Sequence, residues 1–300
     1  MLKIAYHPIY KHPLPLGHRF PMGKYELLHQ QLLYEGTCTE DNFFEPEIPN
    51  NKHLFMVHDA DYVSDLMNLS LDPKIARRIG FPLSEILIER EMIITDGTIK
   101  ASEFAFYNGI AMNIAGGTHH AFTNKGEGFC LFNDQAIGAR YLQEKGLVKK
   151  IVIVDLDVHQ GNGTAEIFKD DPSVFTFSMH GENNYPFIKE QSDLDISLET
   201  GIQDKEYLAI LKETLPKLIA EQEPDFIYYL SGVDIIESDK LGKLSLTIDG
   251  CKERDKIVLE TCKNFNTPVM CSMGGGYSPE IKTIVDAHAN TFRLAQEIFF

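Results

Sequence analysis

Four short apolar segments, separated from one another by helical patterns, constrain the fold of this 300-residue chain more than any other feature. The apolar segments are residues 150–155, 174–178, 225–230 and 268–273. Helices are expected at residues 24–34, 134–145, 205–221 and 249–264, and after residue 278. Such alternation is typical of an α/β fold with a central, mostly parallel sheet and helices on both faces. No repeat or linker divides the chain, so we expect one domain over residues 1–300, rich in loops up to residue 57.

The composition favours a soluble globular protein. Hydrophobic residues make up 43% of the chain and charged residues 24%, which is too apolar for a disordered one. No apolar run approaches the roughly 20 residues of a membrane helix, and the first residues lack a signal-peptide pattern, so a cytoplasmic protein is expected. Five cysteines without a C-x-x-C pair indicate reduced thiols. A formal net charge of −16 disfavours nucleic acid as a direct ligand.

A turn rich in metal-binding side chains follows the first apolar segment. Its sequence over residues 155–163 is D-L-D-V-H-Q-G-N-G, and a strand alternates its faces, so Asp155, Asp157 and His159 project to one side. Burying these groups without a cation would cost several kcal/mol per unpaired charge, whereas one divalent metal ion neutralises them together. The same turn could also be an exposed acidic loop with an incidental histidine.

A second carboxylate turn is expected at the same edge of the sheet. Asp234 closes the S-G-V-D turn at residues 231–234, directly after the third apolar segment. With Asp157 and His159 it completes a set of three protein ligands, which is typical of a catalytic zinc site with an open fourth position. Two oxygens and one nitrogen also suit iron(II). Asp234 could instead cap the following turn.

Two glycine-containing loops carry further chemistry. The G-G-T-H-H segment at residues 116–120 can aim both His119 and His120 into one pocket, where they would act as base and acid, although a lone histidine pair is more often a surface loop. The G-G-G-Y segment at residues 274–277 lets the backbone approach a ligand and offers the Tyr277 hydroxyl to an oxyanion. It lacks the lysine and the spacing of nucleotide-binding loops.

Together these segments resemble the zinc-dependent histone deacetylases. G-G-T-H-H, G-E-G-F-C at residues 126–130, the 155–163 turn, G-V-D with D-K-L-G at 239–242, and G-G-G-Y occur in the order seen in that family. The resemblance extends from His7 to the final helix and is strongest to class IV and its bacterial relatives. It implies an arginase-like α/β fold and hydrolysis of the amide bond in acylated lysine or acylated polyamine.

The resemblance also implies residue roles. Asp157, His159 and Asp234 correspond to the zinc ligands, and Tyr277 to the oxyanion donor. Asp155 and Asn162 correspond to the residues that orient His119 and His120, respectively. Many relatives carry aspartate at the position of Asn162, so His120 is expected to be the more available proton-transfer group. The residues that correspond to the substrate tunnel are Gly128, Phe129, Tyr185 and Gly275. Those that correspond to a potassium site are Asp155, Asp157, His159, Ser178 and Met179. Arg19 corresponds to the arginine of the product channel behind the zinc.

Several functional alternatives are weighed against lysine deacylation. A ureohydrolase of related fold needs a second metal ion, but Gly161 stands where a further aspartate would be required. An acetylpolyamine amidohydrolase shares the catalytic residues and stays open. A protein that only binds acyl-lysine is disfavoured by Tyr277. We expect acyl chains longer than acetyl to be preferred, and the acidic surface to attract cationic residues that flank the acylated lysine in peptides or proteins. The oligomeric state stays open.

Overall fold

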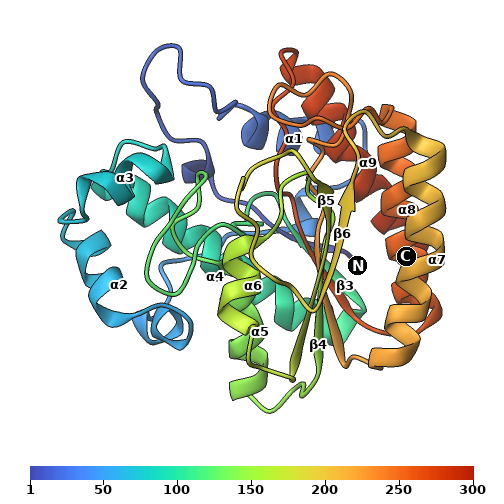
Figure 1. The fold of residues 1–300 in the computed structure, drawn as a ribbon, viewed down its shortest axis with the longest axis horizontal. Coiled ribbons are helices and arrows are strands. Elements are labelled where there is room, and N and C mark those ends of the chain that lie inside the picture. The colour runs from blue at the N-terminus through green and yellow to red at the C-terminus, as the bar shows by residue number, and fades with distance from the viewer.

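A computed structural model describes residues 1–300, and its centre is one eight-stranded sheet in which all strand pairs are parallel (Figure 1). The strand order is β2-β1-β3-β8-β7-β4-β5-β6. The strands are β1 (Lys3–Ala5), β2 (Phe43–Phe44), β3 (Ile110–Asn113), β4 (Ile151–Asp155), β5 (Val174–Gly181), β6 (Leu194–Leu198), β7 (Phe226–Leu230) and β8 (Val269–Ser272).

Helices cover both faces of the sheet. They are α1 (Lys24–Tyr34), α2 (Ala60–Met67), α3 (Pro73–Ile79), α4 (Glu85–Asn108), α5 (Asp134–Glu144), α6 (Asn162–Phe168), α7 (Asp204–Gln222), α8 (Ile248–Asn264) and α9 (Ile281–Phe299), with short 3₁₀ helices at Pro8–Tyr10, Glu40–Asn42 and Asn51–Met56. Figure 1 shows α7, α8 and α9 on one side of the sheet and α4, α5 and α6 on the other. The arrangement confirms the predicted α/β class with helices on both faces. No helix combines the length and the apolar character needed to cross a bilayer.

The central strands are buried on both faces, which explains why they were visible in the sequence. Every residue of β4, β7 and β8 is buried, and such strands form continuous apolar runs. All four predicted strands are present, and the predicted helix at residues 24–34 matches α1.

The structure adds elements that the sequence pattern did not predict. β1, β2 and β3 have two to four residues each, too few to show a periodicity, and β6 is a partly exposed edge strand. β3 follows the 24-residue helix α4 after Gly109 alone, which adopts a φ of +89°. The first 57 residues were expected to be rich in loops, and they are, apart from these short strands, the 3₁₀ helices and α1.

The candidate site lies at the carboxyl ends of four adjacent strands. β3, β8, β7 and β4 are neighbours in the sheet, and the four motif-bearing turns follow their carboxyl ends. In a parallel sheet those ends share one edge, where ligands bind. Segments that are distant in the sequence, around residues 119, 157, 234 and 277, therefore meet there.

Candidate active site

Three buried side chains from two turns form the candidate metal centre. Asp157 and His159 follow β4, and Asp234 follows β7. His159 Nδ1 lies 3.0 Å from Asp157 Oδ1 and 3.1 Å from Asp234 Oδ2. One ligand atom from each residue lies within 4.8 Å of the others. Backbone amides hold the carboxylates in place, because Gly275 N–H donates to Asp157 and Val158 N–H donates to Asp234.

The electrostatics of this cluster fit a cation. Burial would lower the pKa of His159, but its hydrogen bonds to Asp157 and Asp234 raise it to about 10. Burial and the neighbouring Asp157 carboxylate raise the pKa of Asp234 to about 7. The proton on His159 is thus shared with the Asp157 and Asp234 carboxylates and offsets part of their negative charge. A divalent ion bound by the same three donor atoms would replace that proton. The donor set, two oxygens and one imidazole nitrogen, suits zinc with an open position.

The adjacent histidines are held by different partners. His119 Nδ1–H donates to Asp155 Oδ2 and His120 Nδ1–H donates to Asn162 Oδ1, both over 2.6 Å. Burial opposes the charged form of His119, but Asp155 outweighs it and raises its pKa. Burial, with His119 and His159 nearby, lowers the pKa of His120 well below its usual value. His120 is therefore neutral, with a free Nε2 that can accept a proton.

A buried carboxylate that sequence analysis missed shapes the histidine loop. Asp134, at the start of α5, accepts hydrogen bonds from Thr118 N–H (2.9 Å), Thr118 Oγ1 (2.7 Å) and Thr98 Oγ1 (2.6 Å). Gly116 has a φ of +82°, and a Cβ there would overlap Asp134 Oδ2. The glycine therefore allows the loop to close on Asp134 and directs both histidines inward.

A buried arginine also escaped sequence analysis. Arg254, in α8, is fully buried and donates to the carbonyls of Leu156 (3.1 Å) and Gly232 (2.6 Å) from one guanidinium nitrogen. Its charge is balanced by Asp255, 2.8 Å away. Arg254 thus connects the turns after β4 and β7, which carry the candidate metal ligands. In the sequence it was one charged residue within a polar helical pattern, with nothing to mark it as buried.

The glycine segment places Tyr277 beside the metal centre. Tyr277 N–H donates to Asp239 Oδ2 over 2.6 Å, and its ring centroid lies 6.5 Å from that of His159. A Cβ on Gly275 would overlap Asp234 Oδ2 and lie 2.7 Å from Asp157 Oδ2, so this close approach requires glycine. Burial raises the pKa of Tyr277 well above its usual value, which keeps its hydroxyl protonated as a donor.

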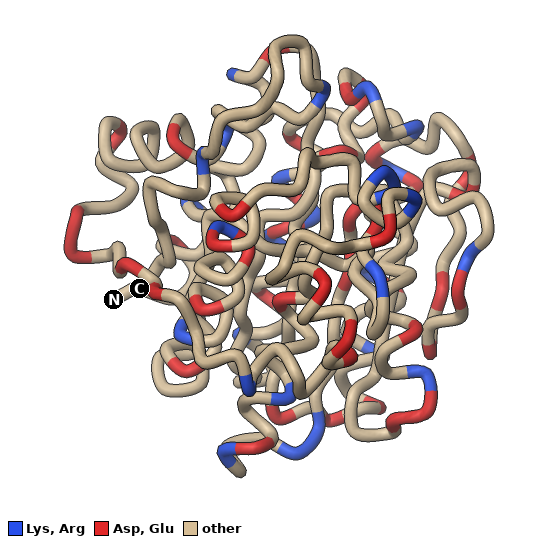
Figure 2. The backbone as a smooth tube through the Cα atoms, turned by 90° about the vertical axis from the view of Figure 1, so that its left-hand side faces the viewer, with Lys and Arg blue, Asp and Glu red and all other residues tan.

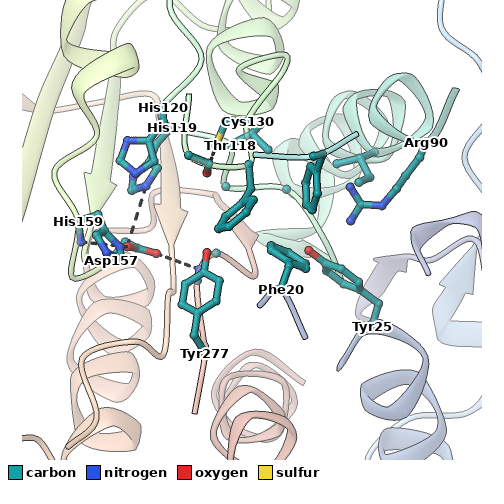
Figure 3. A pocket seen from close by; sticks show the side chains of 18 residues that line it. Phe20, Tyr25, Arg90, Thr118, His119, His120, Cys130, Asp157, His159 and Tyr277 are labelled. Carbon is teal, nitrogen blue, oxygen red and sulfur yellow. Dashed lines mark hydrogen bonds and ion pairs between the residues drawn. The ribbon is translucent and has the colours of Figure 1, made fainter. Parts of the chain in front are cut away.

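The candidate tunnel leads from the surface to these groups. Phe129 and Tyr277 line it, Tyr185 packs edge-on against His120 with ring centroids 5.0 Å apart, and Gly128 is so close to His120 that a Cβ there would lie 2.6 Å from the imidazole ring. The outer cavity has a volume of about 400 Å³. An inner cavity of about 40 Å³ continues past His119, His120 and Tyr277 toward Tyr25 and Arg90. Figure 3 shows His119, His120, Asp157 and His159 on one side of this inner pocket and Phe20, Tyr25 and Arg90 on the other.

The structure corrects the placement of Arg19. Arg19 is exposed on the outer cavity, with its guanidinium carbon 4.9 Å from the centroid of the Phe129 ring. The buried Phe20 takes the inward direction instead and lines the inner pocket. A product channel through Arg19 is therefore wrong, and Arg90 is the basic residue that lines the inner cavity.

Lys24 is a second cation that sequence analysis missed. It is 1% exposed, and Nζ donates to the Gly274 carbonyl over 3.3 Å. Nζ also lies 5.3 Å from the centroid of the Tyr277 ring, and burial lowers the pKa of Lys24 to about 8. The signal in the sequence was its position on the same helical stripe as Leu28 and Leu32, both fully buried.

The predicted potassium site stays a prediction. Ser178 pairs with Asp155 in the register of β4 and β5, and a cavity of about 10 Å³ is lined by both residues. Met179 is fully buried on the next position of β5. The cluster of potential metal ligands itself comprises Asp157, His159 and Asp234.

Comparison with known proteins agrees with this architecture. A family model for the histone deacetylase domain matches residues 18–292. An uncharacterized protein of Picosynechococcus is 46% identical over 99% of both chains, and histone deacetylase 2 of Arabidopsis thaliana is 29% identical over 92% of this chain and 74% of its own. The crystal structure of a histone deacetylase homologue from Aquifex aeolicus superposes with a TM-score of 0.82 at 26% identity, covering 97% of this chain and 82% of that one.

Proposed function

Because this chain belongs to the histone deacetylase family, we propose that it is a zinc-dependent hydrolase that removes acetyl groups from lysine side chains of proteins or peptides. One observation carries the proposal. Asp157 and His159 line the same pocket as the neutral base His120 and Tyr277, and Asp234 lies directly beside these two candidate ligands. Amide hydrolysis needs these three functions together: an electrophile, a proton carrier and an oxyanion donor.

The proposed reaction gives separate roles to the candidate metal ligands, His120 and Tyr277. A zinc ion held by Asp157, His159 and Asp234 would supply Lewis-acid polarisation of the acyl carbonyl and of the attacking water. His120 Nε2 accepts the proton of that water as its oxygen bonds to the carbonyl carbon. Tyr277 donates a hydrogen bond to the carbonyl oxygen as negative charge develops there.

The second half of the reaction uses the same proton. The bond between the carbonyl carbon and the lysine nitrogen breaks, and His120 Nε2 returns its proton to the departing amine. The products are a carboxylate and a free lysine. His119 acts electrostatically: its hydrogen bond to Asp155 raises its pKa, so that it holds positive charge beside the developing oxyanion.

The inner cavity supports a short acyl group. Its volume of about 40 Å³ is far below the roughly 150 Å³ of a cavity that accommodates benzene. A long acyl chain would have no room beyond the catalytic side chains. This argues against the expectation, drawn from the sequence, that activity rises with chain length, and favours acetyl.

The test combines metal analysis with turnover. Purified protein should contain about one zinc ion per chain and hydrolyse an acetyl-lysine peptide, with kcat/KM falling steeply from acetyl to octanoyl in an otherwise identical peptide. Asp234→Ala should lose both the metal and the activity. Glu213→Ala, on the exposed face of α7, is the matched carboxylate control and should retain both. Full activity of metal-free protein would refute the proposal.

A further inference from the structure

The mouth of the active-site cavity is lined by cations. Of the 14 residues around the outer cavity, four are lysine or arginine and none is aspartate or glutamate. The basic residues are Arg19, Arg78, Lys240 and Lys243, which we call the basic rim. His120, His159 and Tyr277 line the inner part of the same cavity, so the basic rim surrounds the entrance to the catalytic residues.

The positive charge of the basic rim is opposite in sign to the net charge of the chain. The protein has 44 acidic and 28 basic residues, so an average surface would carry more carboxylates than cations. Figure 2 shows acidic positions distributed along the whole chain trace. The absence of Asp and Glu from the cavity lining is therefore a local feature of this site and not a consequence of the composition.

Most of the rim charge is not neutralised within the protein. Arg19, Lys240 and Lys243 are exposed and form no ion pair; Lys243 Nζ donates to the Asn183 carbonyl over 2.7 Å. Arg78 lies 3.5 Å from the Glu127 carboxylate, but this carboxylate also forms an ion pair with Lys125 at 3.1 Å. The entrance thus presents net positive charge to an incoming substrate.

The basic rim is fixed to the catalytic machinery. Lys240 follows Asp239, which accepts a hydrogen bond from the backbone N–H of Tyr277 over 2.6 Å. Arg19 stacks on the ring of Phe129, a tunnel wall, at 4.9 Å. With an acylated lysine in the tunnel, charges at these positions would face the residues on either side of that lysine.

We propose that the protein selects acetyl-lysine in acidic segments, with the basic rim binding Asp or Glu residues that flank the acetylated lysine. This rests on the proposed deacetylase function and names its substrate class. It differs from the expectation that the acidic surface attracts cationic flanks, because at physiological salt the Debye length is about 8 Å and charges at the entrance act on the substrate more strongly than distant ones. It also disfavours acetylpolyamines, whose remaining amines are cationic.

The first experiment compares three acetyl-lysine peptides that differ only in the flanking residues: Asp/Glu, Gly/Ala, or Lys/Arg. We expect kcat/KM for the acidic peptide to exceed that for the neutral one by about fivefold for each ion pair that the peptide forms with the basic rim, which is equivalent to about 1 kcal/mol. The basic peptide should have the lowest kcat/KM. The advantage should shrink as salt is raised from about 0.02 to about 0.5 M. Equal rates, or a preference for the basic peptide or for an acetylpolyamine, would overturn the inference.

The second experiment locates the effect. Lys240→Gln combined with Lys243→Gln should reduce the ratio of kcat/KM for the acidic peptide to that for the neutral peptide toward one. Lys149→Gln, an exposed lysine just before the amino end of β4, is the charge-matched control and should leave that ratio unchanged. Turnover without charge preference would refute the inference alone, whereas no turnover of any peptide would refute the deacetylase function with it.

Discussion

Replacing Asn162 with aspartate should move the acidic limb of the pH–rate profile to higher pH. Asn162 Oδ1 accepts the Nδ1–H of His120 over 2.6 Å, and both side chains are buried. A carboxylate in this position would favour the imidazolium form of His120, opposing the burial that now lowers its pKa. His120 must be neutral to accept a proton from water, so the variant would need a higher pH to reach full activity.

The size of the effect follows from the contact distance. Two unit charges about 4 Å apart interact by about 4 kcal/mol at an effective dielectric constant of 20, and burying the new carboxylate offsets part of this. An opposite charge in such contact typically displaces a titration by about one to three pH units. Because one unit corresponds to a factor of ten, kcat/KM near the foot of the limb should fall about 10- to 1,000-fold.

The assay is kcat/KM for an acetyl-lysine peptide between about pH 5 and 9, since this constant reports on the free enzyme. Metal content and the thermal transition are measured on the same samples. Asn51→Asp, at an exposed position, adds the same charge far from His120 and should leave the limb in place. An unmoved limb in a folded, metal-loaded Asn162→Asp protein would refute the assignment of His120 as the base.

Three further variants test the geometry of the site. Tyr277→Phe should retain the metal but lose about 10²- to 10³-fold in kcat, as expected for the loss of one oxyanion donor. The control Tyr107→Phe, at an exposed position, should behave as wild type. A Tyr277→Phe protein as fast as wild type would show that Tyr277 only packs. Gly275→Ala should lower zinc affinity, measured by competition with a chelator, because its Cβ would overlap a metal-binding carboxylate; unchanged affinity would contradict that clash. Arg254→Met should lower the free energy of unfolding, measured in urea, by about 3–5 kcal/mol, because Asp255 would be left as an unpaired buried charge; a loss below about 1 kcal/mol would contradict that account.

Much of the candidate site was predictable because parallel strands impose a common geometry. Asp157, His159 and Asp234 each follow an apolar segment, and the carboxyl ends of neighbouring strands share one edge. The alternation of side chains along a strand placed Asp155 beside the same cluster. These inferences needed only local sequence and the rule that connects strands in α/β folds.

The supporting residues were not predicted, because their roles depend on burial, and only Lys24, on the apolar stripe of its helix, carried a signal in the sequence. Asp134, Arg254 and Lys24 are charged residues in helical segments, where charge usually indicates a solvated face. In the structure each is buried and bonded to a loop of the site. Which face of a helix is covered is decided by packing against elements distant in the chain.

By itself, the sequence determined the α/β class, the strands β4, β5, β7 and β8 and the residues that could bind metal and carry a proton. Those features arise from short-range patterns: apolar runs, strand alternation and glycine-containing turns. Only the tertiary structure decided the position of Arg19, the small volume behind the catalytic residues and the positive charge of the entrance. The physical reason is that a cavity and its charge are made by side chains from separate loops, whose sum differs in sign from the net charge of the whole chain.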